Sequence, residues 1–139
     1  MSRTIHKQPY NNEIVPPIPD LEIALGLPQA TETLGPFCAI VDSGADATLI
    51  PTETLKHLGV QAWDEAILRG PWGEGRRIYT YLVDVHIYGQ VFPGIEVVGD
   101  DEGETIVLGR NLLNKLILLL DGPDTTLYIL TQCPRHLKF

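Results

Sequence analysis

One carboxylate in this chain stands between two apolar runs, a place where a strand can hold an acid for chemistry. Asp42 follows Ile40 and Val41, and Leu49 and Ile50 come shortly after it. A carboxylate held at the end of a strand can accept a proton from water as a base or donate one as an acid. The same segment has ordinary turn composition, because Asp and Ser bond nearby backbone N–H groups and glycine supplies positive φ. Taken alone, it therefore predicts either a site or a turn.

The wider pattern around this carboxylate resembles a known signature. The segment is Ile40-Val41-Asp42-Ser43-Gly44-Ala45-Asp46-Ala47-Thr48-Leu49-Ile50. It is similar to the active-site motif of retropepsin-like aspartic proteases, the single-domain relatives of pepsin. A second match lies downstream, at Val107-Leu108-Gly109-Arg110-Asn111-Leu112-Leu113. The two motifs occur in the order and at the kind of separation seen in that family, and the resemblance covers residues 18–130.

This resemblance implies an all-β fold, a retropepsin-like acid protease barrel with one or two short helices that works as a C2 homodimer. The long 117–130 hairpin and the net charge of −8 are more similar to the cellular and bacterial branch than to the viral one. The chain has one Asp-Ser-Gly, at Asp42, whereas a pepsin-like monomer needs two. The resemblance therefore implies an aspartic-type endopeptidase whose second carboxylate is Asp42 of another copy.

The residues after Asp42 take roles from the same resemblance. Ser43 would bond across the dimer axis to the partner's backbone, and Gly44 would let the two loops approach closely. Serine replaces the commoner threonine here, which puts the strength of the dimer in doubt. Ala45 and Asp46 would line the cleft where the main chain of the substrate binds.

The second motif implies structural support beneath the site. Gly109 and Arg110 match its Gly-Arg pair, and the family arginine pairs with an aspartate of the active-site loop. We therefore expect an ion pair between Asp46 and Arg110. If that pair is buried, removing one partner would cost several kcal/mol. If it lies on the surface, the cost would be below about 1 kcal/mol.

A glycine-rich tip precedes a long alternating strand, which predicts a hairpin. Its candidate flap residues, which would close over a bound peptide and exclude water, are Trp72, Gly73 and Gly75. Trp72 could equally belong to the core. The strand that follows alternates from Tyr79 to Ile87, and no basic groove accompanies its tyrosines, so it does not predict a base-stacking surface.

The remaining elements follow from periodicity and turn residues. The sequence predicts strands at 21–25, 37–41, 91–98, 105–108, 117–120 and 127–130, the one at 37–41 buried on both faces. Pro93-Gly94 interrupts the strand at 91–98 and suggests an edge position or a bulge. The sequence predicts a short helix beginning near Thr52, which would cap it, and ending at Gly59, and a second short helix beginning at Arg110. The acidic run 100–104 predicts a solvated loop rather than a calcium loop.

We expect an N-terminal arm at 1–17 that orders only on assembly, a protease domain at 18–131 and a C-terminal tail at 132–139.

Composition excludes several other classes. The net charge of −8 disfavours nucleic acid and anionic lipid, which need clustered Lys and Arg. No apolar run is long enough to span a membrane, and no signal peptide is recognisable, so we expect a cytoplasmic protein. The two cysteines have no metal-type spacing and predict free thiols rather than a disulfide. We expect no metal and no cofactor.

Two hypotheses remain open from the sequence. The first is a homodimeric endopeptidase acting on polypeptide substrates. The alternative is a catalytically silent module of the same fold that serves for dimerisation or peptide binding, because a fold does not imply an activity.

Overall fold

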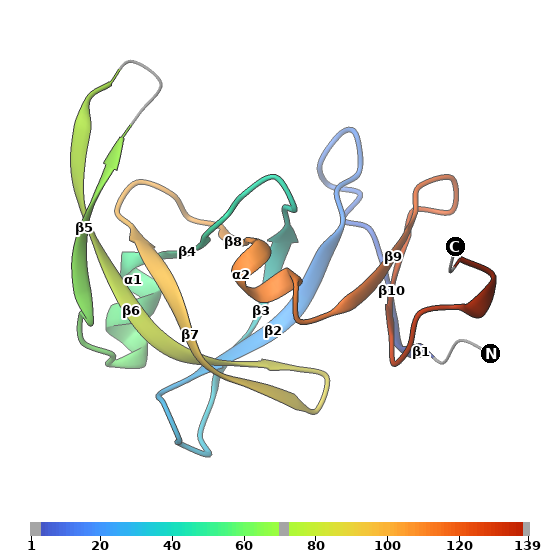
Figure 1. Cartoon of the computed structure of the whole chain (residues 1–139), viewed down its shortest axis with the longest axis horizontal. Coiled ribbons are helices and arrows are strands. Elements are labelled where there is room, and N and C mark those ends of the chain that lie inside the picture. Colours follow the sequence, from blue (N-terminus) through green and yellow to red (C-terminus); the bar gives the residue numbers. More distant parts are fainter. Residues whose placement is uncertain (1–3, 70–72, 138–139) are drawn as a thin grey trace.

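The computed structural model describes residues 4–69 and 73–137, and most of its elements are strands (Figure 1). The strands are β1 (Thr4–Pro9), β2 (Asp20–Gly26), β3 (Leu34–Val41), β4 (Thr48–Pro51), β5 (Asp64–Arg69), β6 (Gly75–Ile87), β7 (Gln90–Asp100), β8 (Ile106–Leu108), β9 (Ile117–Asp121) and β10 (Thr126–Leu130). The helices are α1 (Thr52–Leu58) and α2 (Arg110–Leu113), with a 3-10 turn, η1, at Arg135–Leu137. Neither of these helices has the length and apolarity to cross a membrane in the described part of the chain.

Seven strands form the main sheet, in the order β2-β3-β8-β4-β7-β6-β5. A further antiparallel pairing between β2 and β6 curls this sheet into a barrel. Most neighbours are antiparallel, but β3 pairs with β8 and β4 pairs with β7 in parallel. Strand β3, which precedes the Asp42 loop, therefore lies beside β8. Strand β4, which follows the loop, lies beside β7. The expected all-β barrel with two short helices is therefore confirmed.

The barrel core follows the alternation of its strands. Leu21, Ile23 and Leu25 of β2 are buried, whereas Glu22 between them is exposed. Alternate residues of β6, β7 and β8 complete this core, including Val83, Val85, Ile87, Ile95, Val97, Ile106 and Leu108. Because β6 continues past the barrel into the β5–β6 hairpin, its earlier Tyr79 is exposed.

Two sequence expectations about these elements were wrong. Strand β3 is not buried on both faces, because Cys38 lies opposite the exposed Glu22 and faces outward. Thr52 does not cap α1, since Pro51 is the N-cap residue and the Thr52 hydroxyl donates to Asp101 at 2.6 Å. Helix α1 does end at Gly59, which adopts a left-handed φ of 84°, as expected.

A bulge interrupts the β6–β7 hairpin where the sequence Pro93-Gly94 suggested one. The register shifts there, and the buried Asp84 alone lies opposite both Pro93 and Gly94. One oxygen of Asp84 accepts the Gly94 N–H at 2.9 Å, and the other accepts the Gln29 N–H at 2.9 Å. This carboxylate therefore joins the bulge to the loop between β2 and β3.

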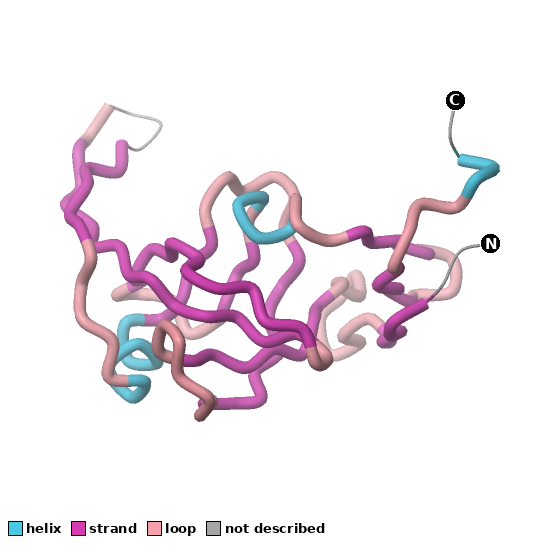
Figure 2. Tube along the Cα trace, turned by 60° about the horizontal axis from the view of Figure 1, so that its bottom comes forward, coloured by secondary structure: helices cyan, strands magenta, loops and turns pink. Residues whose placement is uncertain are grey.

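A separate three-stranded sheet, in the order β1-β10-β9, lies at the end of the molecule that carries both termini (Figure 1). The view of Figure 2 places the β5–β6 hairpin at the opposite end. The expectation that the N-terminal arm orders only on assembly is wrong for residues 4–9, because β1 pairs with β10 of its own chain. The domain boundaries themselves stay a prediction.

Gln8 fastens β1 to the barrel. Its Nε2 donates to Asp20 at 2.7 Å, and its Oε1 accepts from the Tyr88 hydroxyl at 2.6 Å and from the Glu22 N–H at 3.1 Å. The rings of His6 and Tyr88 stack with centroids 3.4 Å apart. Burial raises the pKa of Tyr88 to about 12. Burial also raises the pKa of Asp20, although the hydrogen bond from Gln8 acts in the opposite direction.

Candidate active site

Asp42 lies on a tight loop between two strands of the barrel. Strand β3 ends at Val41 and β4 begins at Thr48, so residues 42–47 form the connection. The Asp42 side chain is exposed, and its Oδ1 accepts the Gly44 N–H at 2.9 Å. The Ala45 N–H donates to the Asp42 carbonyl at 3.1 Å. The loop is thus a genuine turn that presents a carboxylate to solvent, so the two interpretations of this segment are compatible.

The second sequence motif holds this loop in place. The Asp42 N–H donates to the Leu108 carbonyl at 3.1 Å, and the Arg110 N–H donates to the Ala45 carbonyl at 2.8 Å. Arg110 also donates from its Nη1 to the Ser43 carbonyl at 2.8 Å. These bonds run from the end of β8 and the start of α2 to three residues of the loop. The structure therefore brings the two motifs together.

Gly109 sits where a side chain would not fit. A Cβ built on this buried glycine would overlap the Ala47 carbonyl group and lie 2.9 Å from the Ala47 nitrogen. Its φ of −94° is open to any residue, so the requirement for glycine comes from this close approach and not from backbone conformation. The Gly109 N–H donates to the Thr48 hydroxyl at 3.1 Å.

Thr48 and Asn111 are support residues that the sequence reasoning missed. The Thr48 hydroxyl, fully buried, donates to Asn111 Oδ1 at 2.8 Å, and Asn111 Nδ2 donates to the Glu96 carbonyl at 2.7 Å. The first bond joins the start of β4 to α2, and the second joins α2 to β7. Thr48 belongs to the first sequence motif and Asn111 to the second. Their positions in these motifs were the only feature of the sequence that could have indicated a supporting role.

The expected ion pair between Asp46 and Arg110 is not formed. The ion pairs among the described residues are Lys56–Glu53, Arg76–Glu102 and Arg77–Glu65. Asp46 and Arg110 are both exposed, and the guanidinium of Arg110 is directed to the Ser43 carbonyl. Arg110 thus supports the loop by donating to a backbone carbonyl. This contact does not involve Asp46.

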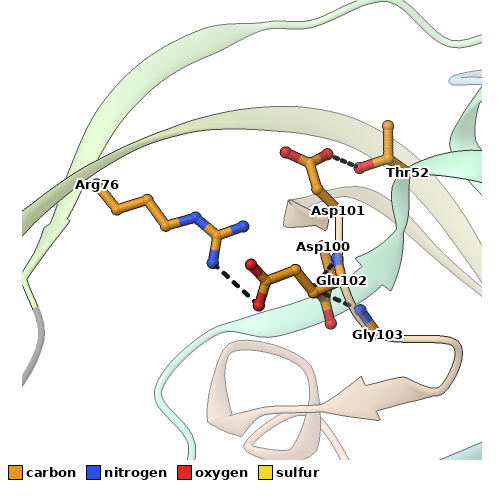
Figure 3. A network of polar contacts seen from close by, with 6 residues as sticks. All are labelled: Thr52, Arg76, Asp100, Asp101, Glu102 and Gly103. Atoms are coloured by element: carbon orange, nitrogen blue, oxygen red, sulfur yellow. Dashed lines mark hydrogen bonds and ion pairs between the residues drawn. The ribbon is translucent and has the colours of Figure 1, made fainter.

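The predicted flap corresponds to the β5–β6 hairpin. Trp72 lies outside the described residues, whereas Gly73 adopts a φ of 84° before β6 begins at Gly75. Figure 3 shows Arg76 of β6 and Glu102, in the loop after β7, forming an ion pair of 3.7 Å. That loop is a turn stabilised by Asp100, whose Oδ1 accepts the N–H groups of Glu102 and Gly103 at 3.1 and 2.9 Å. The base of the hairpin is therefore linked to the acidic loop.

Two cavities lie beside this acidic loop. One of about 530 Å³ is lined by α1 and the loop, including Thr52, Glu53, Asp100 and Asp101. It does not include the Asp42 loop, so we assign it no part in the chemistry. A smaller one of about 180 Å³ lies under the hairpin base and is lined by Leu49, Arg76, Ile78, Val98, Gly99 and Asp100.

One exposed carboxylate on a rigid loop can accept a proton from water or donate one. It cannot act as acid and base at the same time, which would require a second carboxylate close by. Within residues 4–69 and 73–137, no three His, Cys, Asp or Glu side chains lie close enough together to hold a metal ion.

Comparisons with known proteins identify the fold. No family model matches the sequence, and no curated protein sequence is similar to it. Among solved structures, a retropepsin-like aspartic protease from Rickettsia conorii is similar over 94% of both chains, with a TM-score of 0.61 and 16% identity.

Two viral proteases are also similar. The EIAV protease, complexed with the inhibitor HBY-793, matches over 70% of this chain and 86% of its own, with a TM-score of 0.52 and 18% identity. The Simian Foamy Virus (mac) protease matches over 69% of this chain and 92% of its own, with a TM-score of 0.50 and 19% identity. The expected resemblance is thus confirmed at the level of structure: this chain has the retropepsin-like fold.

Proposed function

We propose that this protein is an aspartic endopeptidase that hydrolyses polypeptides with a dyad of Asp42 and Asp42 from a second copy. The observation that carries the proposal is the exposed Asp42 carboxylate, held on a loop that residues 108–110 fix by hydrogen bonds, within a retropepsin-like fold. A turn that served only to connect two strands would not need the hydrogen bonds with residues 108 and 110.

The dyad requires a homodimer because the chain contains one Asp-Ser-Gly. A twofold axis beside the loop would bring two Asp42 carboxylates together without a second motif in the sequence. Two carboxylates in contact cannot both ionise cheaply, so they share a proton and titrate in two steps. One carboxylate is then a base while the other is an acid.

The reaction follows from that shared proton. The ionised Asp42 takes a proton from a water molecule, which attacks the scissile carbonyl carbon, while the protonated Asp42 polarises the carbonyl oxygen. The tetrahedral intermediate then collapses: the leaving nitrogen takes the proton that the first Asp42 removed from water, and the C–N bond breaks. No covalent intermediate with the enzyme is formed. In this proposal Ser43 and Gly44 position the two loops, and the β5–β6 hairpin closes over the peptide.

The test is cleavage of a mixed peptide library by the wild type, Asp42→Asn and the matched control Asp124→Asn. Asp124 is also exposed, but it lies in the β9–β10 turn away from the loop. We expect cleavage by the wild type and the control with a mildly acidic optimum, inhibition by a pepstatin-type compound, and loss of at least about 10³-fold in kcat for Asp42→Asn.

Normal cleavage by Asp42→Asn would refute the proposal. Peptide binding without cleavage by any of the three proteins would instead make this a silent peptide-binding module of the same fold. Size measurements on the same samples show whether a dimer is present when peptide or inhibitor is added.

A further inference from the structure

One face of the barrel sheet leads from the Asp42 loop to the base of the β5–β6 hairpin. Leu49, in the strand that leaves the loop, lies between two buried residues and is itself half-buried, so it points away from the core. Its partner in β7 is Val98, which pairs in turn with Thr80 of β6. Alternate residues of β6 continue this face to Arg76. Arg76 therefore lies on the same side of the sheet as Leu49.

The cavity of about 180 Å³ under the hairpin base lies on this face. Its apolar lining comes from Leu49, Ile78 and Val98, and its charged lining comes from Arg76 and Asp100. Because a water molecule occupies about 30 Å³ in the liquid, the space suits one side chain of a few heavy atoms. Such a side chain would combine an apolar stem with a group that one of the two charges can bind.

Asp100 is already engaged by its own turn, as Figure 3 shows. Its Oδ1 accepts the N–H groups of Glu102 and Gly103 at 3.1 and 2.9 Å. A Cβ built on Gly103 would overlap Asp100 Oδ2, so the second carboxylate oxygen also lies against the turn. Asp100 is therefore a structural residue of the loop, and a ligand for its charge is not needed.

Arg76 is in the opposite situation. In the part of the chain that the structure describes, its one ion pair is with Glu102, at 3.7 Å between Nη1 and Oε2. This separation is longer than a hydrogen bond, and the Glu102 side chain is 81% exposed, so the pair is weak. A guanidinium has five N–H donors in a planar fork that binds a carboxylate through two parallel hydrogen bonds. Arg76 can therefore exchange Glu102 for a better placed carboxylate.

We infer that Arg76 selects an acidic side chain of the polypeptide substrate. The substrate carboxylate pairs with the guanidinium, the stem of the same side chain contacts the apolar lining of the cavity, and Glu102 is released to solvent. The inference rests on the proposed function, since it names the substrate class of the same site. The chain has a net charge of −8 and an acidic run at 100–104, which repel a carboxylate elsewhere on a bound peptide. An acidic residue is thus accepted at one position and disfavoured at the others.

The first test measures binding and does not depend on catalysis. Immobilised Asp42→Asn protein captures peptides from a random library, and the bound peptides are sequenced and aligned. We expect Asp and Glu to be enriched at least about threefold at one position, and this enrichment to disappear in Asp42→Asn/Arg76→Gln. The matched control is Asp42→Asn/Arg77→Gln, which should keep it. Arg77 is the next residue of β6, points to the opposite face and pairs with Glu65 at 2.6 Å. Circular dichroism verifies that the variants are folded.

The second test uses cleavage of peptide pairs that differ only by glutamate or glutamine at the selected position. The ratio of their kcat/KM values should be at least about tenfold in favour of glutamate for the wild type and for Arg77→Gln, and within about twofold for Arg76→Gln. Arg76→Glu should instead favour lysine at that position. A merely structural role of Arg76 would lower kcat/KM for both peptides and leave their ratio unchanged.

The outcomes separate this inference from the protease proposal. Acidic selection in capture without any cleavage by the wild type would support the inference and refute the proposed catalysis. Cleavage that depends on Asp42 but shows no preference for glutamate would overturn the inference and leave the protease proposal intact. Enrichment of lysine and arginine, enrichment of acids that survives Arg76→Gln, or the capture of no peptide would each overturn the inference.

Discussion

Thr48 and Asn111 lie 63 residues apart in sequence and are joined by a hydrogen bond of 2.8 Å between their side chains. Thr48 begins β4, immediately after the Asp42 loop, and Asn111 lies in the first turn of α2. The same threonine oxygen accepts the Gly109 N–H, and Asn111 continues to the Glu96 carbonyl of β7. The end of the loop is therefore fixed by one buried hydroxyl to both ends of the Gly109–Asn111 segment that begins α2, and through Asn111 to β7.

Thr48→Val should destabilise the protein by about 2 kcal/mol, because it leaves the buried Gly109 N–H without an acceptor while keeping the shape of the side chain. We expect a larger proportional loss of peptide cleavage than of folded protein, since the loop loses an anchor. Urea unfolding and kcat/KM measure the two effects. Thr54→Val in α1 is the control, and an equal loss of stability in both variants would contradict the role of Thr48.

Gly109→Ala should be more damaging than its size suggests. The added methyl would overlap the Ala47 carbonyl, which is backbone and cannot move aside without shifting the loop. We expect a loss of at least about 2 kcal/mol in the free energy of unfolding and loss of cleavage. Gly122→Ala is the matched control, since a Cβ there meets nothing within 4 Å. If Gly109→Ala unfolds at the same urea concentration as that control, the close approach does not constrain the loop.

Asp46 and Arg110 should behave as independent residues. Because they form no ion pair, a double-mutant cycle of Asp46→Asn and Arg110→Gln should give a coupling energy below about 0.5 kcal/mol. Arg110→Gln alone should cost about 1 kcal/mol, through the lost bond to the Ser43 carbonyl. Thermal or urea unfolding of the four proteins measures the cycle. A coupling of several kcal/mol would show that the two side chains do form an ion pair.

Much of this fold could be predicted because local patterns determined it. The alternation of β2, the turn at Gly59 and the bulge at Pro93-Gly94 each depend on residues close together in sequence. The Asp42 loop and Arg110 were found from motifs, and the structure brings them together through hydrogen bonds.

The failures have a common physical origin in contacts between distant residues. Threonine is a residue type that often caps helices, but the Thr52 hydroxyl donates to Asp101, which is 49 residues away in sequence. The first residues gave no strand signal strong enough to predict β1, whose place depends on pairing with β10 and on Gln8 reaching Asp20 and Tyr88. The Asp46–Arg110 pair was carried over from the resemblance, and the Ser43 carbonyl competed for the same guanidinium.

Tyr88 should ionise only at strongly alkaline pH. Burial raises its pKa to about 12, so its ionisation should appear as a late step in tyrosinate absorbance as pH rises. A pKa that is higher in the folded state means that stability is present below pH 10 and falls as pH rises toward 12. Tyr88→Phe should remove both the late absorbance step and this loss of stability. Persistence of the late absorbance step in Tyr88→Phe would contradict its assignment to Tyr88.

Asp20 should reduce stability at neutral pH, opposite to the usual effect of a native carboxylate. Its pKa is raised chiefly by burial, so the folded state binds the proton more tightly than the unfolded chain does. The stability it contributes is fully present below its unfolded pKa and is lost as pH rises through the folded value. Asp20→Asn keeps an oxygen that can accept from Gln8 and carries no charge. Relative to the wild type, its free energy of unfolding should therefore rise between pH 3 and pH 7, as measured by urea unfolding, with Asp64→Asn as the exposed control. A relative loss over that interval would mean that the hydrogen bond from Gln8 outweighs desolvation and that the Asp20 pKa is lowered.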